Sequence, residues 1–514
     1  MTASTTVVGE SSAARLDAAY ARVKQRLLDE RNAAGHWTGE LSSSALSTAT
    51  AVSALAIVDR ERSKRQVAGL DREYPRRRSQ LLDLLEKGVK RLVELQNADG
   101  GWGDTDKSFS NIATTMLADA AFRLAGVEKR VAQPLEKAGA YLDAQGRVAG
   151  LVKRYGKDKT FSVPILTNCA LAGQAKWSDI TPLPFEMACL PRSLLGAMQL
   201  PVVSYALPAL IAIGQARYFH RPPGWWNPIM RLARGAAVAP SLRKLTTIQP
   251  ESGGFLEATP LTSFVVMSLA SIGQVTHPVV EQGVQFLIDS VRPDGSWPID
   301  TNLATWTTTL SLNALAAGGE AVDELPCLDW VLSCQHRVEH PYTGAAPGAW
   351  AWTDLSGGVP DADDTPGALL ALANVRHAAL RAKKPLDSRW ADAAGRGVRW
   401  LLQLQNDDGG WPTFCRGWGT LPFDRSGTDL TAHAIRAIHS WIGKLAGEGA
   451  SPKVAALAAQ FDKRCQDAIE RGFKYLAKTQ RADGGWLPLW FGNQHHPEEE
   501  NPVYGTSRVL LAYR

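Results

Sequence analysis

The sequence predicts an all-α protein made of two α/α barrels, and a recurring motif is the main evidence. In each clear copy a helix ends in Gln, a turn containing Asp-Gly-Gly follows, and a Trp stands six positions after the Gln. The clearest copies are Gln96–Trp102, Gln405–Trp411 and Gln480–Trp486. The chain also has no convincing strand segment, and helical stretches rich in small residues separate the copies. Such repeats indicate stacked helical hairpins.

Weaker copies extend the pattern over most of the chain. Trp297 follows a turn in which Val291 replaces Gln, Phe255 replaces Trp after Gln249, and further copies end at Trp37 and Trp350. Asp-Gly-Gly favours a turn with positive φ. The Gln side chain can bond backbone groups at the helix end, and the indole can pack over the turn and donate its N–H. Each copy is therefore expected to join two helices through a clamped turn.

The order of the copies predicts the domain organisation. We expect an N-terminal extension and first helix over 1–34, a first barrel over 35–272 and a second barrel over 273–514. The helices expected to line the barrels are rich in small residues, and they span 42–55, 112–124, 262–269, 307–315, 369–375 and 430–438.

Composition narrows the class of protein. With 514 residues, 45% of them hydrophobic and 21% charged, the chain has ordinary globular composition and is long enough for two domains. The net charge is +5, and no block of Lys and Arg is long enough to predict nucleic-acid binding. The six cysteines form no Cys-x-x-Cys pair, which favours a reduced compartment and no structural metal. Neither a signal peptide nor an apolar run of spanning length is visible.

A cluster of three carboxyl groups, Asp361, Asp363 and Asp364, stands immediately before Thr365 and an apolar run. One interpretation is the start of a helix, because Asp is favoured at an N-cap and in the first turn. The other is an acid, because carboxyl groups held close together cannot all ionise freely. The cluster alone does not choose between them.

The segment from about 182 to 240 interrupts the repeats and is rich in Pro and apolar residues. Within it, Trp225 and Trp226 stand beside Ile229 and Met230, a combination typical of a membrane interface. A buried helix followed by a surface loop would give the same pattern. We expect these four residues to face a lipid surface.

The Gln–Trp repeats together with Pro-Asp-Ala-Asp-Asp-Thr, residues 360–365, resemble the squalene–hopene cyclases, which are class II terpene cyclases. The resemblance covers nearly the whole chain. It implies two α/α barrels that sit in one membrane leaflet, a cavity that takes up a polyprenyl chain, and protonation of a terminal alkene by the middle Asp. It implies no metal or other cofactor, a peripheral location on the cytoplasmic side of a membrane, and a homodimer.

Site residues are carried over where the motifs match. Asp363 falls on the proton donor and Asp361 and Asp364 flank it. His433 resembles the His that contacts this Asp, with Asp429 as its neighbour, and Tyr504 in Tyr-Gly-Thr resembles the Tyr that polarises the acid through water. The residues that resemble cavity aromatics are Trp306, Trp352, Phe414, Trp490 and Trp177.

Physical chemistry agrees with this assignment. An alkene is a weak base, so its protonation needs an unusually strong acid, and a cationic His433 beside Asp363 would make the proton easier to release. Aromatic faces can stabilise a migrating cation without acting as nucleophiles, and a dry cavity keeps water from quenching it.

Departures from the family pattern leave the product open. The aromatic-Gln-Phe-Asp-Asn run that precedes the acid motif in the family is here Trp352 to Ser356, and Thr307 replaces the Asp after the first cavity Trp. The chain ends at Arg514, where the family has about two further repeats. We therefore expect an incomplete second barrel, belonging either to a truncated sequence or to a short form that a partner completes.

Three alternatives remain. A class II diterpene cyclase acting on geranylgeranyl diphosphate would share the Asp-x-Asp-Asp acid. A protein prenyltransferase β subunit would need Asp, Cys and His zinc ligands, which the sequence does not assemble. A non-catalytic helical-repeat scaffold would need no proton donor. Squalene or a similar polyprenyl chain is the expected substrate.

Overall fold

The structure is a computed structural model that describes residues 6–69, 74–156, 158–191, 206–341, 343–414, 422–445 and 452–514. Cys415 and residues 192–205 of the expected membrane-facing segment lie outside these ranges. The described chain is mostly helical, and its only paired strands are the two-residue β1 (Ser43–Ser44) and β2 (Trp297–Pro298). The predicted all-α class is confirmed.

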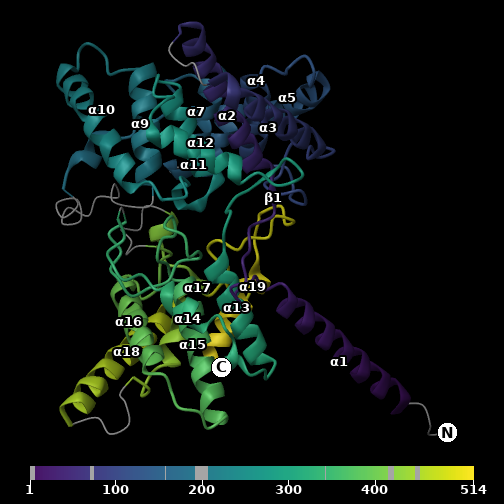
Figure 1. Cartoon of the computed structure of the whole chain (residues 1–514), viewed down its shortest axis with the longest axis vertical. Helices are drawn as coiled ribbons and strands as arrows, with labels where there is room; N and C mark the ends of the chain where they lie inside the picture. Colours follow the sequence, from purple (N-terminus) through teal and green to yellow (C-terminus); the bar gives the residue numbers. More distant parts are fainter. Residues whose placement is uncertain are drawn as a thin grey trace.

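The helices gather in two lobes, which Figure 1 shows one above the other. Each lobe has its own hydrophobic core. The first lobe contains α2 (Ala45–Val67), α3 (Tyr74–Glu94), α4 (Ile112–Leu124), α5 (Ala132–Gln145), α6 (Arg147–Tyr155), α7 (Lys159–Leu171), η1 (Phe185–Cys189), α9 (Leu207–His220), α10 (Pro228–Ile248), η3 (Phe255–Glu257), α11 (Thr259–Ala270) and α12 (Pro278–Asp289).

The second lobe contains α13 (Ala304–Ala317), η4 (Val322–Glu324), α14 (Leu328–Ser333), α15 (Asp364–Arg381), α16 (Ser388–Leu404), η5 (Pro422–Asp424), α17 (Thr428–His439), α18 (Pro452–Thr479) and α19 (Pro502–Tyr513). Helix α1 (Thr6–Asp29) projects away from this lobe in Figure 1. Its C-terminal half is attached to the lobe by an ion pair of 2.9 Å between Lys24 and Glu320.

Inner helices surround the axis of each lobe. In the first lobe α2, α4, α7, α9 and α11 pack in sequence order, and α11 packs back against α2. In the second lobe α13, α15, α17 and α19 also pack in sequence order. Small residues allow this close packing, since residues 45–58 of α2 are almost entirely buried although most of them are Ala, Ser, Thr or Val. Five of the six stretches expected to be inner helices are helical throughout, and the stretch 42–55 is helical from Ala45 onward.

The predicted turn clamp is confirmed in atomic detail. The Gln405 amide donates 2.8 Å and 2.9 Å hydrogen bonds to the carbonyls of Gly409 in the turn and Ala468 in the next outer helix. The Trp411 indole donates to the Leu401 carbonyl at 2.8 Å. These bonds tie the end of α16, the turn after it and the middle of α18 to one another.

A third part of the clamp was not predicted. The backbone N–H of the Trp or Phe in each repeat donates to the hydroxyl of a Thr one turn into an inner helix. The pairs are Trp37–Thr308, Trp102–Thr115, Phe255–Thr262, Trp297–Thr48, Trp350–Thr365, Trp411–Thr431 and Trp486–Thr506. Thr365 and Thr506, which occur within the two site motifs, are thus parts of the scaffold.

Two of these pairs show how the repeats divide between the lobes. Trp297 lies in the first core and is clamped to Thr48 of α2, whereas Trp37 lies in the second core and is clamped to Thr308 of α13. Helix α12, which we expected to open the second barrel, packs against α11 in the first lobe. Each turn is therefore bonded to an inner helix that is distant in sequence but adjacent in space.

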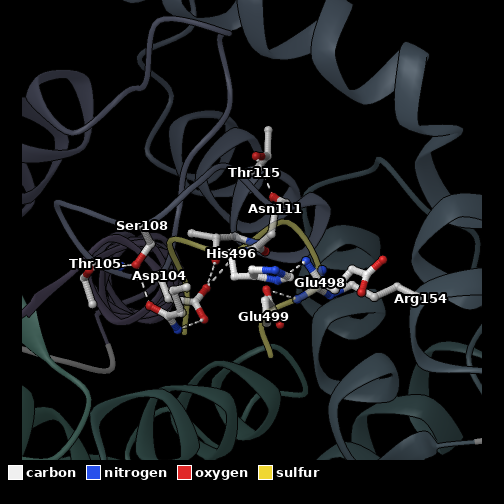
Figure 2. Close-up of polar contacts among 11 residues, drawn as sticks. Asp104, Thr105, Ser108, Asn111, Thr115, Arg154, His496, Glu498 and Glu499 are labelled. Carbon is white, nitrogen blue, oxygen red and sulfur yellow. Dashed lines mark hydrogen bonds and ion pairs between the residues drawn. The ribbon is translucent and has the colours of Figure 1, made fainter. Parts of the chain in front are cut away.

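The loop before α19 connects the second lobe to the first (Figure 2). The Gln494 side chain donates to Asp104 at 3.1 Å, and the Gln494 backbone carbonyl accepts the backbone N–H of Phe109 at 3.2 Å. Farther along the loop, Glu499 forms a 2.8 Å ion pair with Arg154 of α6. These contacts hold the loop that precedes α19 against the first lobe.

Candidate active site

The acidic cluster forms the start of α15, as the helix-start interpretation predicted. Oδ1 of Asp361 accepts the backbone N–H groups of Asp363 and Asp364 at 2.8 Å and 2.7 Å. Asp361 is 3% exposed, and the backbone on both sides of it is bonded to neighbouring loops. One carboxyl of the three therefore has a structural task, and its hydrogen bonds fix the backbone of the middle residue.

The side chain of Asp363 lies between α17 and α19. Its Oδ1 atom is 3.9 Å from Nε2 of His433 on α17 and 3.6 Å from a terminal guanidinium nitrogen of Arg508 on α19. Gly367, one turn into α15, lies beside the same imidazole, and a Cβ there would make an ordinary 3.8 Å contact with Nε2. The expected proximity of Asp363 and His433 is present, and Arg508 is a neighbour that sequence reasoning missed.

Burial raises the pKa of all three carboxyl groups. For Asp363 the upward shift caused by burial exceeds the opposing effect of the Arg508 guanidinium, and Asp429 and the Trp306 side chain have smaller effects. For Asp364 burial acts together with the charges of Asp361 and Asp363, and its pKa lies well above the ordinary value. The acid interpretation of the cluster is therefore also supported, since these groups retain protons at higher pH than exposed carboxyls do.

The prediction that His433 is cationic is wrong. Burial lowers the pKa of His433 well below its ordinary value, and the guanidinium groups of Arg508 and Arg436 lower it further. The imidazole is 5% exposed, and within the described chain its Nδ1 atom has no hydrogen-bond partner. Two fixed positive charges make a third one unfavourable in a buried site, so His433 is neutral.

Two further predicted residues join this group. Asp429 is 1% exposed and accepts the backbone N–H of Leu489 at 3.2 Å, one turn before His433 on α17. Tyr504 lies on α19 one turn before Arg508, whose guanidinium lies 5.7 Å from the phenol ring centre. Burial raises the pKa of Tyr504 to about 12, against the opposing effect of Arg508, so the phenol keeps its proton.

Aromatic rings border the group in two stacks. The first runs through Trp352, Phe414, Phe423 and Trp490, with successive ring centres 5.9, 5.0 and 4.3 Å apart. The second runs from Trp306 through Phe491 to Tyr504, with separations of 6.5 and 5.0 Å. A 3.0 Å hydrogen bond from the Trp306 backbone N–H to the Trp352 carbonyl joins the stacks. Four predicted cavity aromatics are thus brought together.

Phe423 and Phe491 were missed because neither belongs to a motif. Phe423 follows a segment outside the described residues, and Phe491 belongs to the loop that reaches the first lobe. For Phe491, the sequence signal that could have found it was its neighbour Trp490, which was predicted. Its indole donates to the Thr413 hydroxyl at 2.6 Å, which fixes the ring beside Phe423.

Comparisons with known proteins identify the family. The profile of the squalene–hopene cyclase N-terminal domain matches residues 20–206, and that of the squalene–hopene cyclase C-terminal domain matches residues 302–514. The chain belongs to the squalene–hopene cyclase family. The match includes the acid motif, α17 and α19, so the three elements that surround Asp363 lie within the C-terminal family domain.

Individual relatives of this family member are distant. Squalene–hopene cyclase of Alicyclobacillus acidocaldarius is 24% identical in an alignment 551 positions long. This alignment covers 96% of this chain and 79% of the relative. Enfumafungin synthase of Hormonema carpetanum is 25% identical over 496 residues, and the match spans 82% of this chain but only 35% of that protein. The structure of ent-copalyl diphosphate synthase from Arabidopsis thaliana superimposes with a TM-score of 0.47 and 14% identity, covering 92% of this chain and 54% of the plant chain.

The remaining predicted cavity residue of this cyclase family member does not join the group in the described structure. The Trp177 indole stacks on His220 at the end of α9, with ring centres 4.3 Å apart. Sequence position alone placed Trp177 in the cavity set, and its local contacts belong to the first lobe.

The four residues expected at a membrane surface lie on the outside of the first lobe. Trp225, Trp226 and Ile229 are about four-fifths exposed, and Met230 is 37% exposed. They stand at the start of α10, where the Asn227 side chain accepts the Met230 backbone N–H at 3.2 Å. The preceding helix α9 is largely buried, so the arrangement agrees both with a buried helix followed by a surface segment and with a surface that faces lipid.

The described ranges contain neither a candidate membrane-spanning helix nor a candidate metal-binding cluster. No helix there is both long and apolar enough to cross a bilayer. No cluster of three His, Cys, Asp or Glu side chains there is placed to hold a metal ion.

Proposed function

We propose that this protein is a class II terpene cyclase that uses Asp363 to protonate the terminal alkene of a polyprenyl chain. The observation that carries the proposal is the position of Asp363, a protonatable carboxyl that is 18% exposed and lies between Arg508, His433 and the Trp306 stack. The O–H bond of the carboxyl breaks, a C–H bond forms at the alkene, and the electron pair stays on the carboxylate. The resulting tertiary cation is then attacked by successive double bonds of the substrate.

The aromatic stacks support the later steps. Ring faces attract cations through their quadrupole and form no covalent bond with them. The Trp352 and Trp306 stacks present such faces from separate loops and helices, which suits a cation that moves along a folded chain. Burial of the neighbouring polar groups keeps the effective dielectric low, which strengthens these interactions.

Squalene is the proposed substrate, and a hopene-like triterpene the proposed product. The support is the squalene–hopene cyclase of Alicyclobacillus acidocaldarius, of which this chain spans 79%. The exposed surface formed by Trp225, Trp226, Ile229 and Met230 is consistent with withdrawal of a hydrocarbon from a bilayer, and we propose peripheral binding on the cytoplasmic side. A homodimer remains a proposal from the family resemblance.

The membrane part of the proposal has its own test. Replacing Trp225, Trp226 and Ile229 with Ser should weaken binding to phospholipid vesicles in a flotation assay without changing the thermal unfolding midpoint. The matched control is Leu457→Ser on α18, an exposed apolar residue of the other lobe. Equal binding by the patch variant and the control would contradict the proposed surface.

Product analysis tests the chemistry. Membranes containing the protein are incubated with squalene, and separately with geranylgeranyl diphosphate, and the products are identified by mass spectrometry. We expect a polycyclic C30 hydrocarbon or alcohol that is absent with Asp363→Asn, while that variant keeps the wild-type circular dichroism spectrum. A bicyclic diphosphate would assign the chain to diterpene cyclisation, and unchanged product from Asp363→Asn would contradict the role of this residue.

A further inference from the structure

We propose that Arg508 is a positioning residue that supplies the fixed positive charge beside the Asp363 carboxyl. This inference rests on the proposed function, because it concerns the strength of the acid. It differs from the expectation drawn from the family resemblance, which assigned the charge to histidine.

The geometry of Arg508 suits this task. Its guanidinium nitrogen is 3.6 Å from Oδ1 of Asp363, which is longer than a hydrogen bond. The carboxyl is therefore close enough to be affected by the charge, but Arg508 itself donates no direct hydrogen bond to Oδ1. A guanidinium keeps its proton under all ordinary conditions, so its charge does not depend on pH.

Arg508 is held in place by its helix. It lies one turn after Tyr504 on α19, and its guanidinium lies over the phenol ring. Helix α19 is seated on the Trp486 turn, because Gly505 leaves no room for a Cβ, which would stand 2.3 Å from the Trp486 carbonyl. The side chain of Arg508 is 19% exposed, which limits screening of its charge by water.

The positive charge of Arg508 interacts most strongly with Asp363 after proton transfer, when the carboxyl has become an anion. A carboxyl that has given its proton to an alkene becomes an anion in a buried site, which is costly without compensation. Arg508 would stabilise that anion, and it is already in position before the reaction begins. Burial keeps the proton on Asp363 beforehand, and Arg508 favours its release.

Other charged groups lie around the same carboxyl. They are Asp361 and Asp364 on its own loop, Asp429, His433 and Arg436 on α17, and Tyr504 on α19. Removing Arg508 would also raise the pKa of His433, because Arg508 is one of the causes that lower it. A protonated His433 would affect the acidic side of a pH profile, whereas loss of the Asp363 proton determines the alkaline side.

The test compares Arg508→Gln and Arg508→Lys with the wild-type full chain. Arg481→Gln is the control, because it removes one positive charge from a surface ion pair with Glu500. We expect Arg508→Gln to lower kcat about tenfold or more. We also expect the alkaline limb of its pH–rate profile to move up by roughly one to three units, because the opposing charge is gone. Arg508→Lys should restore part of both effects.

A second measurement needs no substrate. Infrared titration of the Asp363 carboxyl, identified by subtracting the Asp363→Asn spectrum, should give a higher pKa in Arg508→Gln than in the wild type or in Arg481→Gln. An unchanged Asp363 titration would overturn the inference even if turnover fell. If the titration moves as expected but the wild-type protein forms no cyclic product from either substrate, the inference stands and the proposed function fails.

Discussion

Oδ1 of Asp361 lies 2.8 Å from the backbone nitrogen of Asp363 and accepts its hydrogen bond. The same atom accepts the backbone N–H of Asp364, so one buried carboxyl caps α15 and also fixes the proposed acid. The two interpretations of the acidic cluster are therefore compatible, because different residues carry out the two tasks.

This relationship predicts different effects for two substitutions of Asp361. Asp361→Ala removes the acceptor and should destabilise the protein by about 1–2 kcal/mol, the usual value of an N-cap. Asp361→Asn keeps Oδ1 and should cost much less. Urea unfolding followed by circular dichroism measures both, and equal midpoints for the two variants would show that the cap contributes nothing.

Titration of the Glu257 carboxyl is expected to make the stability of the folded protein depend on pH. It is fully buried, and its Oε1 atom accepts hydrogen bonds from Ser252 at 2.8 Å and from the Gly357 backbone at 3.1 Å in the other lobe. Burial raises the pKa of Glu257 from 4.5 to about 7. The folded protein thus binds a proton that the unfolded chain has already lost, so this contribution to stability is complete below pH 4.5 and declines as pH rises through 7.

Glu257→Gln should flatten this decline, because an amide does not titrate and still accepts through its oxygen. The difference between the two curves should reach about 1–3 kcal/mol near neutral pH. Thermal unfolding midpoints of both proteins over a pH series measure it. Part of the slope should remain, since burial and Glu257 also raise the pKa of Asp300 to about 7. Parallel curves would exclude Glu257 as the titrating group.

The hydrogen bonds of the turn clamp predict unequal losses of stability when the two equivalent glutamines, Gln405 and Gln480, are replaced. Gln405 is 4% exposed and donates to two carbonyls, whereas Gln480 is exposed and donates to the Gly484 carbonyl at 2.8 Å. Gln405→Ala leaves buried acceptors without partners and should cost about 1–3 kcal/mol. Gln480→Ala should cost less, because water replaces the lost bond. Denaturant midpoints compare the two, and an equal loss would mean that burial does not determine the strength of the clamp.

Substitution of Phe423 is expected to change the product mixture rather than the folding of the protein. Its ring contacts both Phe414 and Trp490, with ring centres 5.0 and 4.3 Å away. Phe423→Leu should loosen this stack, so that cations escape at more than one stage and the product mixture broadens. Phe473→Leu on α18, whose ring pairs with Tyr513, is the control. Gas chromatography of the products measures the effect, and an unchanged product ratio would place Phe423 outside the reaction path.

Local chemistry made much of the architecture predictable. The Gln and Trp of each repeat act on a turn only a few residues away, so spacing alone predicted the clamp that Gln405 and Trp411 form. The same locality made the cap at Asp361 predictable. The inner helices were predictable because close packing around an axis requires a continuous run of small residues.

Only the tertiary structure determined the electrostatics of the site. Arg508 and Asp363 are far apart in the chain, and no local pattern indicates that α19 brings them within 3.6 Å. The neutral state of His433 follows from burial and from two arginines on different helices. The exchange of the Trp37 and Trp297 turns between lobes likewise depends on which inner helix lies beside each turn. The sequence by itself therefore determined the repeating scaffold and the candidate acid, because both depend on near neighbours. The three-dimensional packing determined which charge stands beside that acid, because Coulomb interactions depend on distance in space and on exclusion of water.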